Sequence, residues 1–164
     1  MSKTLVIVRH AKTETQRDGQ RDFDRNLIER GRNDAITMAQ RLQKLGIIPD
    51  LILSSSANRT LQTSELMAGV LGYAPEAIEQ SERLYHSSSE VIADVLSHVP
   101  EPIQTCCLVA HNPGVSQFVY DMQQDLFVGE MPTAALVVIR ILSDNWQDLD
   151  SARKEFLLYD YPKK

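Results

Sequence analysis

Residues 5–10 read LVIVRH, an apolar run that ends abruptly in Arg9 and His10. Consecutive branched apolar residues are typical of a β-strand that is buried on both faces. In open α/β sheets, ligands bind at the edge formed by the carboxyl ends of such strands. This stretch therefore predicts a buried strand that carries a cation and an imidazole to a ligand-binding edge, and it indicates an anion site there.

The bulk composition is that of an ordinary globular domain. The 164 residues are 43% hydrophobic and 24% charged, and the net charge is −5. This length predicts a single domain over residues 1–164, and the negative charge argues against a nucleic-acid or membrane-surface binder. With no signal-peptide pattern and no apolar run near the ~20 residues of a spanning helix, we expect a cytoplasmic protein, and we expect it to be a monomer.

Strand and helix patterns alternate after the first strand. We expect strands at residues 4–9, 51–53, 104–110, 134–142 and 155–160, a weak extended segment at 78–85, and helices at 28–45, 57–71, 89–98 and from Pro113 onward. This alternation predicts an α/β sandwich with a largely parallel sheet. Residues 11–26 are polar without an apolar period, and we interpret them as a surface loop.

Details of this pattern predict where several helices begin. Residues 54–56 are three serines whose hydroxyls are expected to cap the helix at 57–71. Ser87 and Glu90 have the spacing of a capping box at the start of the next helix. His98 comes late in that helix, where it is expected to interact with the helix dipole. The adjacent Cys106 and Cys107 are interpreted as small core residues.

Three strand-to-helix junctions carry the residues that we expect to do chemistry. Arg9 and His10 follow the first strand, Arg59 follows the second, and His111 follows the strand at 104–110. Parallel strands would bring these junctions to one sheet edge, beside helix N-termini that favour anions. Arginine matches phosphate oxygens bidentately, and a histidine can attack phosphorus. The pattern predicts a phosphate pocket built without a metal ion or a P-loop.

A family resemblance runs along nearly the whole chain. The residues that carry it are Val8–Lys12, Arg25–Leu27, Arg30–Arg32, Leu53–Ser55, Arg59–Thr63, Leu84–Tyr85, Val109–Gly114 and Met131–Ala135. With these motifs in this order, the chain resembles the histidine phosphatase superfamily, in particular its SixA-type phosphohistidine phosphatases. The resemblance implies a phosphoglycerate mutase-like fold, which is a three-layer α/β/α sandwich with a mixed sheet of about six strands, one of them antiparallel.

The resemblance also implies roles for individual residues. His10 would be the phosphorylated nucleophile, and Arg9, Arg59 and His111 would clamp the phosphoryl group. Arg25 matches a loop arginine of the family, although Asn26 stands where the family has proline and Ile28 where it has threonine. Arg25 and Asn112 are taken as substrate-binding residues. No cofactor or metal is implied, and the partner would be a phosphohistidine-bearing signalling or phosphotransfer protein.

The segment before the second histidine bears on the leaving group. Relatives that act on phosphate esters use a carboxylic acid to protonate an alkoxide. Residues 81–90 offer Glu82, His86 and Glu90, and the sequence does not decide which of them, if any, donates a proton. Imidazole, with a pKa near ~6.5, is a far weaker base than an alkoxide and needs an acid less. The sequence therefore favours phosphohistidine as the substrate.

Alternative readings stay open at this point. A small-molecule phosphomonoesterase or a mutase-like enzyme of the same superfamily is the first alternative. A non-catalytic phosphoprotein-binding module is less favoured, because binding alone does not require a nucleophile. A cysteine phosphatase is excluded, since Asn112 and Pro113 stand where its arginine would follow the cysteines. Residues 22–24 mimic an Asp-x-Asp motif, but no apolar strand precedes them.

Overall fold

The computed structural model of the chain describes residues 1–123 and 128–164. Within these ranges six strands form one sheet in the order β3-β2-β4-β1-β5-β6. Their bounds are β1 (Lys3–Arg9), β2 (Leu51–Ser55), β3 (Glu79–Ser81), β4 (Thr105–Ala110), β5 (Leu136–Ile141) and β6 (Lys154–Asp160). Only β5 runs against its neighbours, as the antiparallel pairs β1·β5 and β5·β6 show. The expected mixed sheet with one antiparallel strand is confirmed.

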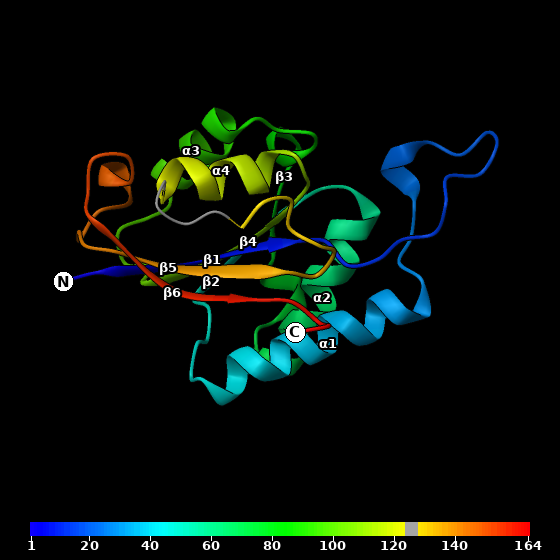
Figure 1. Ribbon diagram of the computed structural model, residues 1–164, viewed down its shortest axis with the longest axis horizontal. Helices are drawn as coiled ribbons and strands as arrows, with labels where there is room; N and C mark the ends of the chain where they lie inside the picture. The colour runs from blue at the N-terminus through cyan, green and yellow to red at the C-terminus, as the bar shows by residue number, and fades with distance from the viewer. Residues whose placement is uncertain (124–127) are drawn as a thin grey trace.

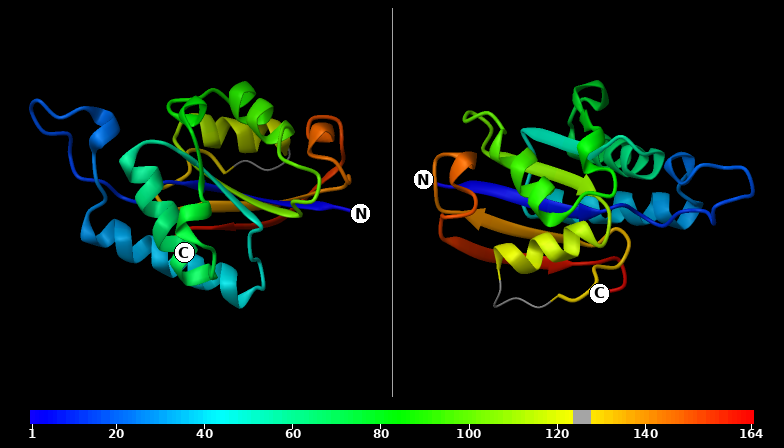
Figure 2. Two further views of the ribbon diagram at one scale, coloured as in Figure 1. Left: turned by 180° about the vertical axis from the view of Figure 1, so that it is seen from behind. Right: turned by 90° about the horizontal axis from the view of Figure 1, so that it is seen from above.

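Four α-helices in the described ranges cover the two faces of the sheet. Helices α1 (Glu29–Lys44) and α2 (Asn58–Leu71) lie on one face, and α3 (Ser89–Ser97) and α4 (Gly114–Met122) lie on the other (Figure 1). The view from behind shows the same three layers, and the view from above looks down onto the face of the sheet (Figure 2). None of the helices in the described ranges is long and apolar enough to cross a bilayer.

The double burial expected of the first strand is observed. Leu5 packs into the core under α3 and α4, whereas Val6 packs into the core on the side of α1 and α2, and neither is more than 1% exposed. The same alternation separates the two cysteines, because Cys106 belongs to the first core and Cys107 to the second. Each face of the sheet therefore buries its own apolar layer, as expected for neighbouring residues of a strand.

The predicted helix caps are wrong in detail. Ser54 and Ser55 lie inside β2, and the N-cap of α2 is Ala57, which makes no side-chain capping bond. The N-cap of α3 is Ser88, whose hydroxyl accepts a hydrogen bond from the Val91 N–H, so the expected capping box of Ser87 with Glu90 does not form. Likewise α4 begins at Gly114, one residue later than expected. Each error is a shift of one to three residues, within which several polar side chains could serve as caps.

The polar segment 11–26 is more than a surface loop. It leaves the carboxyl end of β1, at the opposite end of the sheet from the N-terminus (Figure 1), and contains a 3₁₀ turn, η1 (Asp22–Asp24). The α2 side chains of Asn58 and Gln62 tie this segment down, because both donate hydrogen bonds to the side-chain oxygen of Asn26, at 3.2 and 2.7 Å. The segment is thus held beside the first turn of α2.

Candidate active site

The three strand-to-helix junctions meet at one pocket of about 270 Å³, here called the cradle. The residues that line it are Arg9, His10, Lys12, Thr13, Asp22, Arg25, Arg59, His86, His111, Asn112 and Thr133. All six residues predicted from the sequence are therefore brought together, although what each does stays a prediction. Close packing of the backbone makes this possible, because a Cβ on Gly31 of α1 would lie 2.1 Å from the carbonyl oxygen of Lys12.

His10 is held in one orientation and in one protonation state. Its Nδ1 lies 2.8 Å from the carbonyl oxygen of Ala11, which can only accept, so Nδ1 carries the proton and Nε2 keeps its lone pair. The Ala11 N–H in turn donates to the Thr63 hydroxyl of α2. Burial, followed by the hydrogen bond to Ala11 acting in the opposite direction and by the charge of Arg59, sets the pKa of His10 at about 3. The imidazole is neutral at physiological pH.

His111 lies next to His10, with ring centroids 5.4 Å apart. Burial and the positive charge of Arg59 lower the pKa of His111 to about 2, so this ring is also neutral. Its Nε2 is 2.8 Å from the Ser55 hydroxyl at the end of β2. When that hydroxyl donates, Nδ1 of His111 carries the proton and is a hydrogen-bond donor.

Unpaired polar atoms concentrate on the residues that line the cradle. Within the described ranges, the buried side-chain nitrogen and oxygen atoms without a hydrogen-bond partner are Arg9 Nε, Arg59 Nε, His111 Nδ1 and Ser64 Oγ. Three of these four belong to cradle residues. A buried polar atom without a partner costs about 1–3 kcal/mol, and such atoms are rare in native proteins. Their concentration here is typical of a site built for a polar ligand.

Asp22 is a central residue of the cradle that the sequence did not identify. Its Oδ1 accepts from Arg25 Nε at 3.0 Å, and its Oδ2 accepts from Arg59 Nη2 at 2.9 Å and from the Tyr85 hydroxyl at 2.7 Å. Burial alone would raise the pKa of the Asp22 carboxyl, but the hydrogen bonds from Tyr85 and Arg59 and the charges of both arginines bring it well below its usual value. The carboxyl is therefore ionised. In the sequence, Asp22 stood out only as part of an Asp-x-Asp pattern at residues 22–24, and that pattern was set aside because no apolar strand precedes it.

Aromatic rings pack against one another beside the cradle, and the Arg59 guanidinium lies over one of them, Tyr85, at 5.9 Å from the ring centroid. Tyr85 packs against His86 with ring centroids 4.1 Å apart, and against His111 at 5.5 Å. Phe23 of η1 meets Tyr85 edge to face at 5.0 Å. His86 lines the cradle, and its Nε2 lies 3.2 Å from Asp22 Oδ2. Glu82 and Glu90 are exposed and do not line the cradle.

The loop arginine is well placed despite the departure from the family sequence. Arg25 donates from Nη1 to the Thr13 hydroxyl at 3.1 Å and from Nε to Asp22. The Asn26 N–H donates to Oε2 of Glu14 at 2.9 Å, a hydrogen bond that proline could not make. The asparagine thus fixes the loop by polar contacts where the family has a rigid ring.

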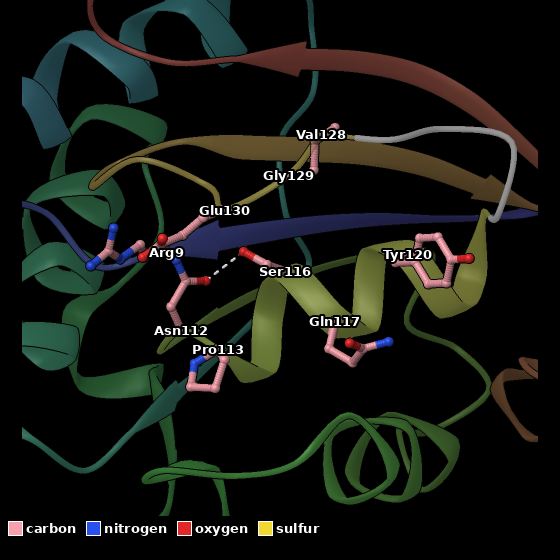
Figure 3. A pocket seen from close by; sticks show the side chains of 9 residues that line it. All are labelled: Arg9, Asn112, Pro113, Ser116, Gln117, Tyr120, Val128, Gly129 and Glu130. Atoms are coloured by element: carbon pink, nitrogen blue, oxygen red, sulfur yellow. Dashed lines mark hydrogen bonds between the residues drawn. The ribbon is translucent and has the colours of Figure 1, made fainter.

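Asn112 joins the cradle to a second, larger pocket. This groove has a volume of about 830 Å³ and runs along α4 from Arg9 towards Tyr120, as Figure 3 shows. The Asn112 amide donates to the Met131 carbonyl at 2.9 Å and accepts from the Ser116 hydroxyl at 2.6 Å. With these contacts, Asn112 braces the backbone between the two pockets, which is a structural role beside its predicted part in binding.

No group of three or more His, Cys, Asp or Glu side chains that could hold a metal ion occurs among the described residues. The basic side chains of the cradle are the groups that could hold an anion, since Arg9, Arg25 and Arg59 are opposed by the single carboxylate of Asp22. The N-terminal turn of α2 adds its N–H dipoles to this field, because Arg59 is the second residue of that helix. The site is thus locally positive within a chain of net charge −5.

Comparison of the chain sequence with known families gives one clear match. Residues 5–98 match the family model of the histidine phosphatase superfamily, branch 1. An uncharacterised chloroplastic protein of Arabidopsis thaliana is 43% identical over 67 residues, which make up 41% of this chain. This match spans only 31% of the length of the plant protein.

Solved structures share the fold over nearly the whole chain. A "putative phosphohistidine phosphatase SixA" from Agrobacterium tumefaciens is similar with a TM-score of 0.83 and 28% identity, covering 98% of this chain and 99% of that one. Its counterpart from Nakamurella multipartitia gives 0.82 and 23%, covering 99% and 97%. A mycobacterial glucosyl-3-phosphoglycerate phosphatase gives 0.68 and 20%, covering 95% and 97%.

Proposed function

The chain belongs to the histidine phosphatase superfamily, and on that premise we propose that it hydrolyses protein phosphohistidine through a phosphorylated His10. One observation carries the proposal. Arg9, Arg59 and His111, each of which has a buried polar atom without a partner, line the same pocket as a neutral, oriented imidazole. A phosphoryl group supplies the oxygen acceptors that these residues lack, and it supplies the electrophile that the imidazole needs.

The proposed reaction has two displacements at phosphorus. In the first, the Nε2 lone pair of His10 forms a bond to phosphorus while the bond from phosphorus to the substrate nitrogen breaks. The departing nitrogen keeps that electron pair and takes up one proton, so the substrate leaves as neutral imidazole. In the second, a water oxygen attacks phospho-His10, which releases inorganic phosphate and restores the neutral imidazole. Arg9 and Arg59 stabilise the charge on the non-bridging oxygens in both steps.

The low pKa of His10 serves the first step. A nucleophilic imidazole must be neutral, and a pKa of about 3 keeps it so across the physiological range. The hydrogen bond from Nδ1–H to the Ala11 carbonyl stabilises the positive charge that develops on the ring when phosphorus binds Nε2. Burial therefore keeps Nε2 of His10 unprotonated, and the hydrogen bond to Ala11 fixes the orientation of the ring.

The surroundings of the cradle support a protein-borne substrate. The groove along α4 shares Arg9 and Asn112 with the cradle, so a chain segment in the groove would present a phosphorylated side chain to His10. The lining includes Tyr120, which is 44% exposed, and Gln117 (Figure 3). Two structural relatives carry the name "putative phosphohistidine phosphatase SixA", which supports the same substrate class. The partner is proposed to be a phosphohistidine-bearing signalling or phosphotransfer protein.

Trapping of the phosphoenzyme tests the nucleophile. A peptide labelled with ³²P-phosphohistidine should transfer an acid-labile, alkali-stable label to the protein, and His10→Ala should abolish the transfer with an unchanged circular dichroism spectrum. His98→Ala is the matched control, because His98 is exposed at the end of α3 and bonds only to its own helix and its neighbour Ser97. Labelling that survives in His10→Ala would refute the assignment.

A substrate panel tests the class of leaving group. We expect a higher kcat/KM for phosphohistidine peptides than for phosphoserine peptides or sugar phosphates. Faster hydrolysis of the esters would instead favour the small-molecule phosphomonoesterase that the sequence leaves as an alternative. Binding of phosphopeptides with no labelling of His10 and no turnover would favour the non-catalytic module.

A further inference from the structure

The segment that carries His86 packs closely against the start of α4. A Cβ on Gly114 at the start of α4 would lie only 2.2 Å from the Ser87 carbonyl oxygen, so this approach requires glycine. His86 itself has a φ of 51°, a left-handed backbone that non-glycine residues rarely adopt. Its side chain is 56% exposed while it lines the cradle. The imidazole is thus held at the mouth of the pocket, where a leaving group departs.

The direction of the His86 ring is set by two contacts. Nε2 lies 3.2 Å from Asp22 Oδ2, and the ring packs on Tyr85 at 4.1 Å between centroids. Because the ionised carboxylate only accepts, Nε2 of His86 carries the proton in this contact. The second nitrogen, Nδ1, is then the one that can exchange a proton with a substrate. An imidazole held by a carboxylate is the usual arrangement of a catalytic acid or base.

We propose that His86, oriented by Asp22, donates the proton to the leaving group when the phosphoryl group moves to His10. This inference rests on the proposed function and names a further catalytic residue for it. In the first step the Nδ1 proton of protonated His86 goes to the departing nitrogen or oxygen as its bond to phosphorus breaks. In the second step neutral His86 takes a proton from the attacking water, so the two steps together leave the residue unchanged.

The other titratable groups around the cradle do not fit this role. Asp22 is ionised and has no proton to give, because its pKa lies below the usual range. Burial, with the hydrogen bond to Asp22, raises the pKa of Tyr85, so its hydroxyl is a weak acid. His111 is neutral, with a pKa lowered to about 2, and its Nε2 is bonded to Ser55. The arginines already have partners, since Arg25 and Arg59 donate to Asp22 and Arg9 donates to the Met131 carbonyl.

The role predicts a specific dependence on the leaving group. A proton donor matters little for a leaving group of low pKa and matters most for a basic one, because only the basic group must be protonated as it leaves. Removing the donor should therefore steepen the dependence of kcat/KM on leaving-group pKa. A residue that only shapes the pocket would change all substrates by the same factor.

The test uses His86→Asn with a series of aryl phosphates, from 4-nitrophenyl to phenyl phosphate, and a phosphohistidine peptide. Asparagine tolerates a positive φ and keeps an amide that can bond Asp22, but it has no proton to exchange. We expect the smallest loss with 4-nitrophenyl phosphate and a loss of about 100-fold or more with phenyl phosphate, at the low end of the usual range for acid catalysis.

Two further variants complete the design. His98→Asn should keep the wild-type leaving-group dependence, since it removes a histidine outside the cradle. Asp22→Asn should steepen the dependence as His86→Asn does, because the acid loses its orienting partner. An equal loss on every substrate in His86→Asn would overturn the proposal. Phosphorylation of His10 by 4-nitrophenyl phosphate in His86→Asn would show that the proposed phosphatase function holds. A failure of the His86 proposal can thus be distinguished from a failure of the proposed function.

Discussion

Asp22→Asn removes the anion around which the cradle is organised, while it keeps the size of the side chain. The carboxylate pairs with Arg59 at 2.9 Å and with Arg25 at 3.0 Å. Arg59 is only 2% exposed, so water is a poor replacement for the lost partner. An asparagine at this place would also point an amide N–H towards groups that are themselves donors. We therefore expect the variant to fold but to be less stable.

The size of the loss follows from burial. Breaking a buried ion pair by removing one partner costs about 3–5 kcal/mol. Because the Asp22 side chain is 29% exposed, we expect a loss of stability at the lower end of this range, at about 3 kcal/mol. For a domain of this length, about 3 kcal/mol lowers Tm by about 6–12 °C.

The loss should depend on pH in a defined direction. The folded-state pKa of the Asp22 carboxyl lies below its ordinary value of 3.8. Its contribution to the free energy of unfolding is therefore complete above that ordinary value and is lost as the pH falls through the folded-state value. The difference between wild type and Asp22→Asn should be full at pH 7 and pH 5, and it should shrink below about pH 4.

Urea denaturation followed by circular dichroism at pH 7, 5 and 3.5 measures this difference. Asp24→Asn is a matched control on the same 3₁₀ turn, because Asp24 pairs with Arg21 and their side chains are 42% and 73% exposed. The control should lose far less stability than Asp22→Asn. The reasoning is refuted if the two variants are equally stable at pH 7, or if the loss in Asp22→Asn is as large at pH 3.5 as at pH 7.

Three other outcomes follow from the structure. The ring signals of His10 should not titrate between pH 8 and pH 4 in NMR spectra, since its pKa is about 3. In the unfolded chain the same imidazole binds a proton below about pH 6.5, so its burial in the folded protein lowers the free energy of unfolding as the pH falls. Gly114→Ala should lower Tm in thermal unfolding because its Cβ would meet a backbone oxygen at 2.2 Å, whereas Gly69→Ala in α2 has open space and should raise stability by about 0.5–1 kcal/mol. Tyr120→Ser should raise KM for a phosphohistidine protein more than for 4-nitrophenyl phosphate, which a steady-state comparison measures.

Local patterns predicted the elements of the fold well. The strand at residues 4–9 and the helix at 57–71 depend on side chains close to each other in the chain, and the structure has β1 at Lys3–Arg9 and α2 at Asn58–Leu71. The presence of one antiparallel strand followed only from the family resemblance, and the structure shows that this strand is β5. The helix caps failed because a shift of one residue changes which hydroxyl faces the helix N–H groups.

Some residues of the site could likewise be predicted from local sequence patterns, and others could not. Arg9, His10, Arg59 and His111 stand at strand-to-helix junctions, and parallel strands place such junctions on one edge, so their meeting was predictable. Arg25 came from the family motif alone. Its position depends on polar contacts of the 11–26 segment with α2, which no periodic pattern reveals.

The group of Asp22, Tyr85 and His86 could not be read from the sequence, because its members lie 63 and 64 residues from the carboxylate that joins them. The sequence left Glu82, His86 and Glu90 undecided as proton donors, and it favoured a leaving group that needs an acid less. The carboxylate in the cradle is indeed too acidic to give a proton, but it can orient an imidazole that does. If His86 protonates alkoxide and imidazole alike, the proton donor does not select between esters and phosphohistidine. Selection must then come from the groove along α4, which is why the Tyr120 variant and the His86 variant have to be compared on the same substrates.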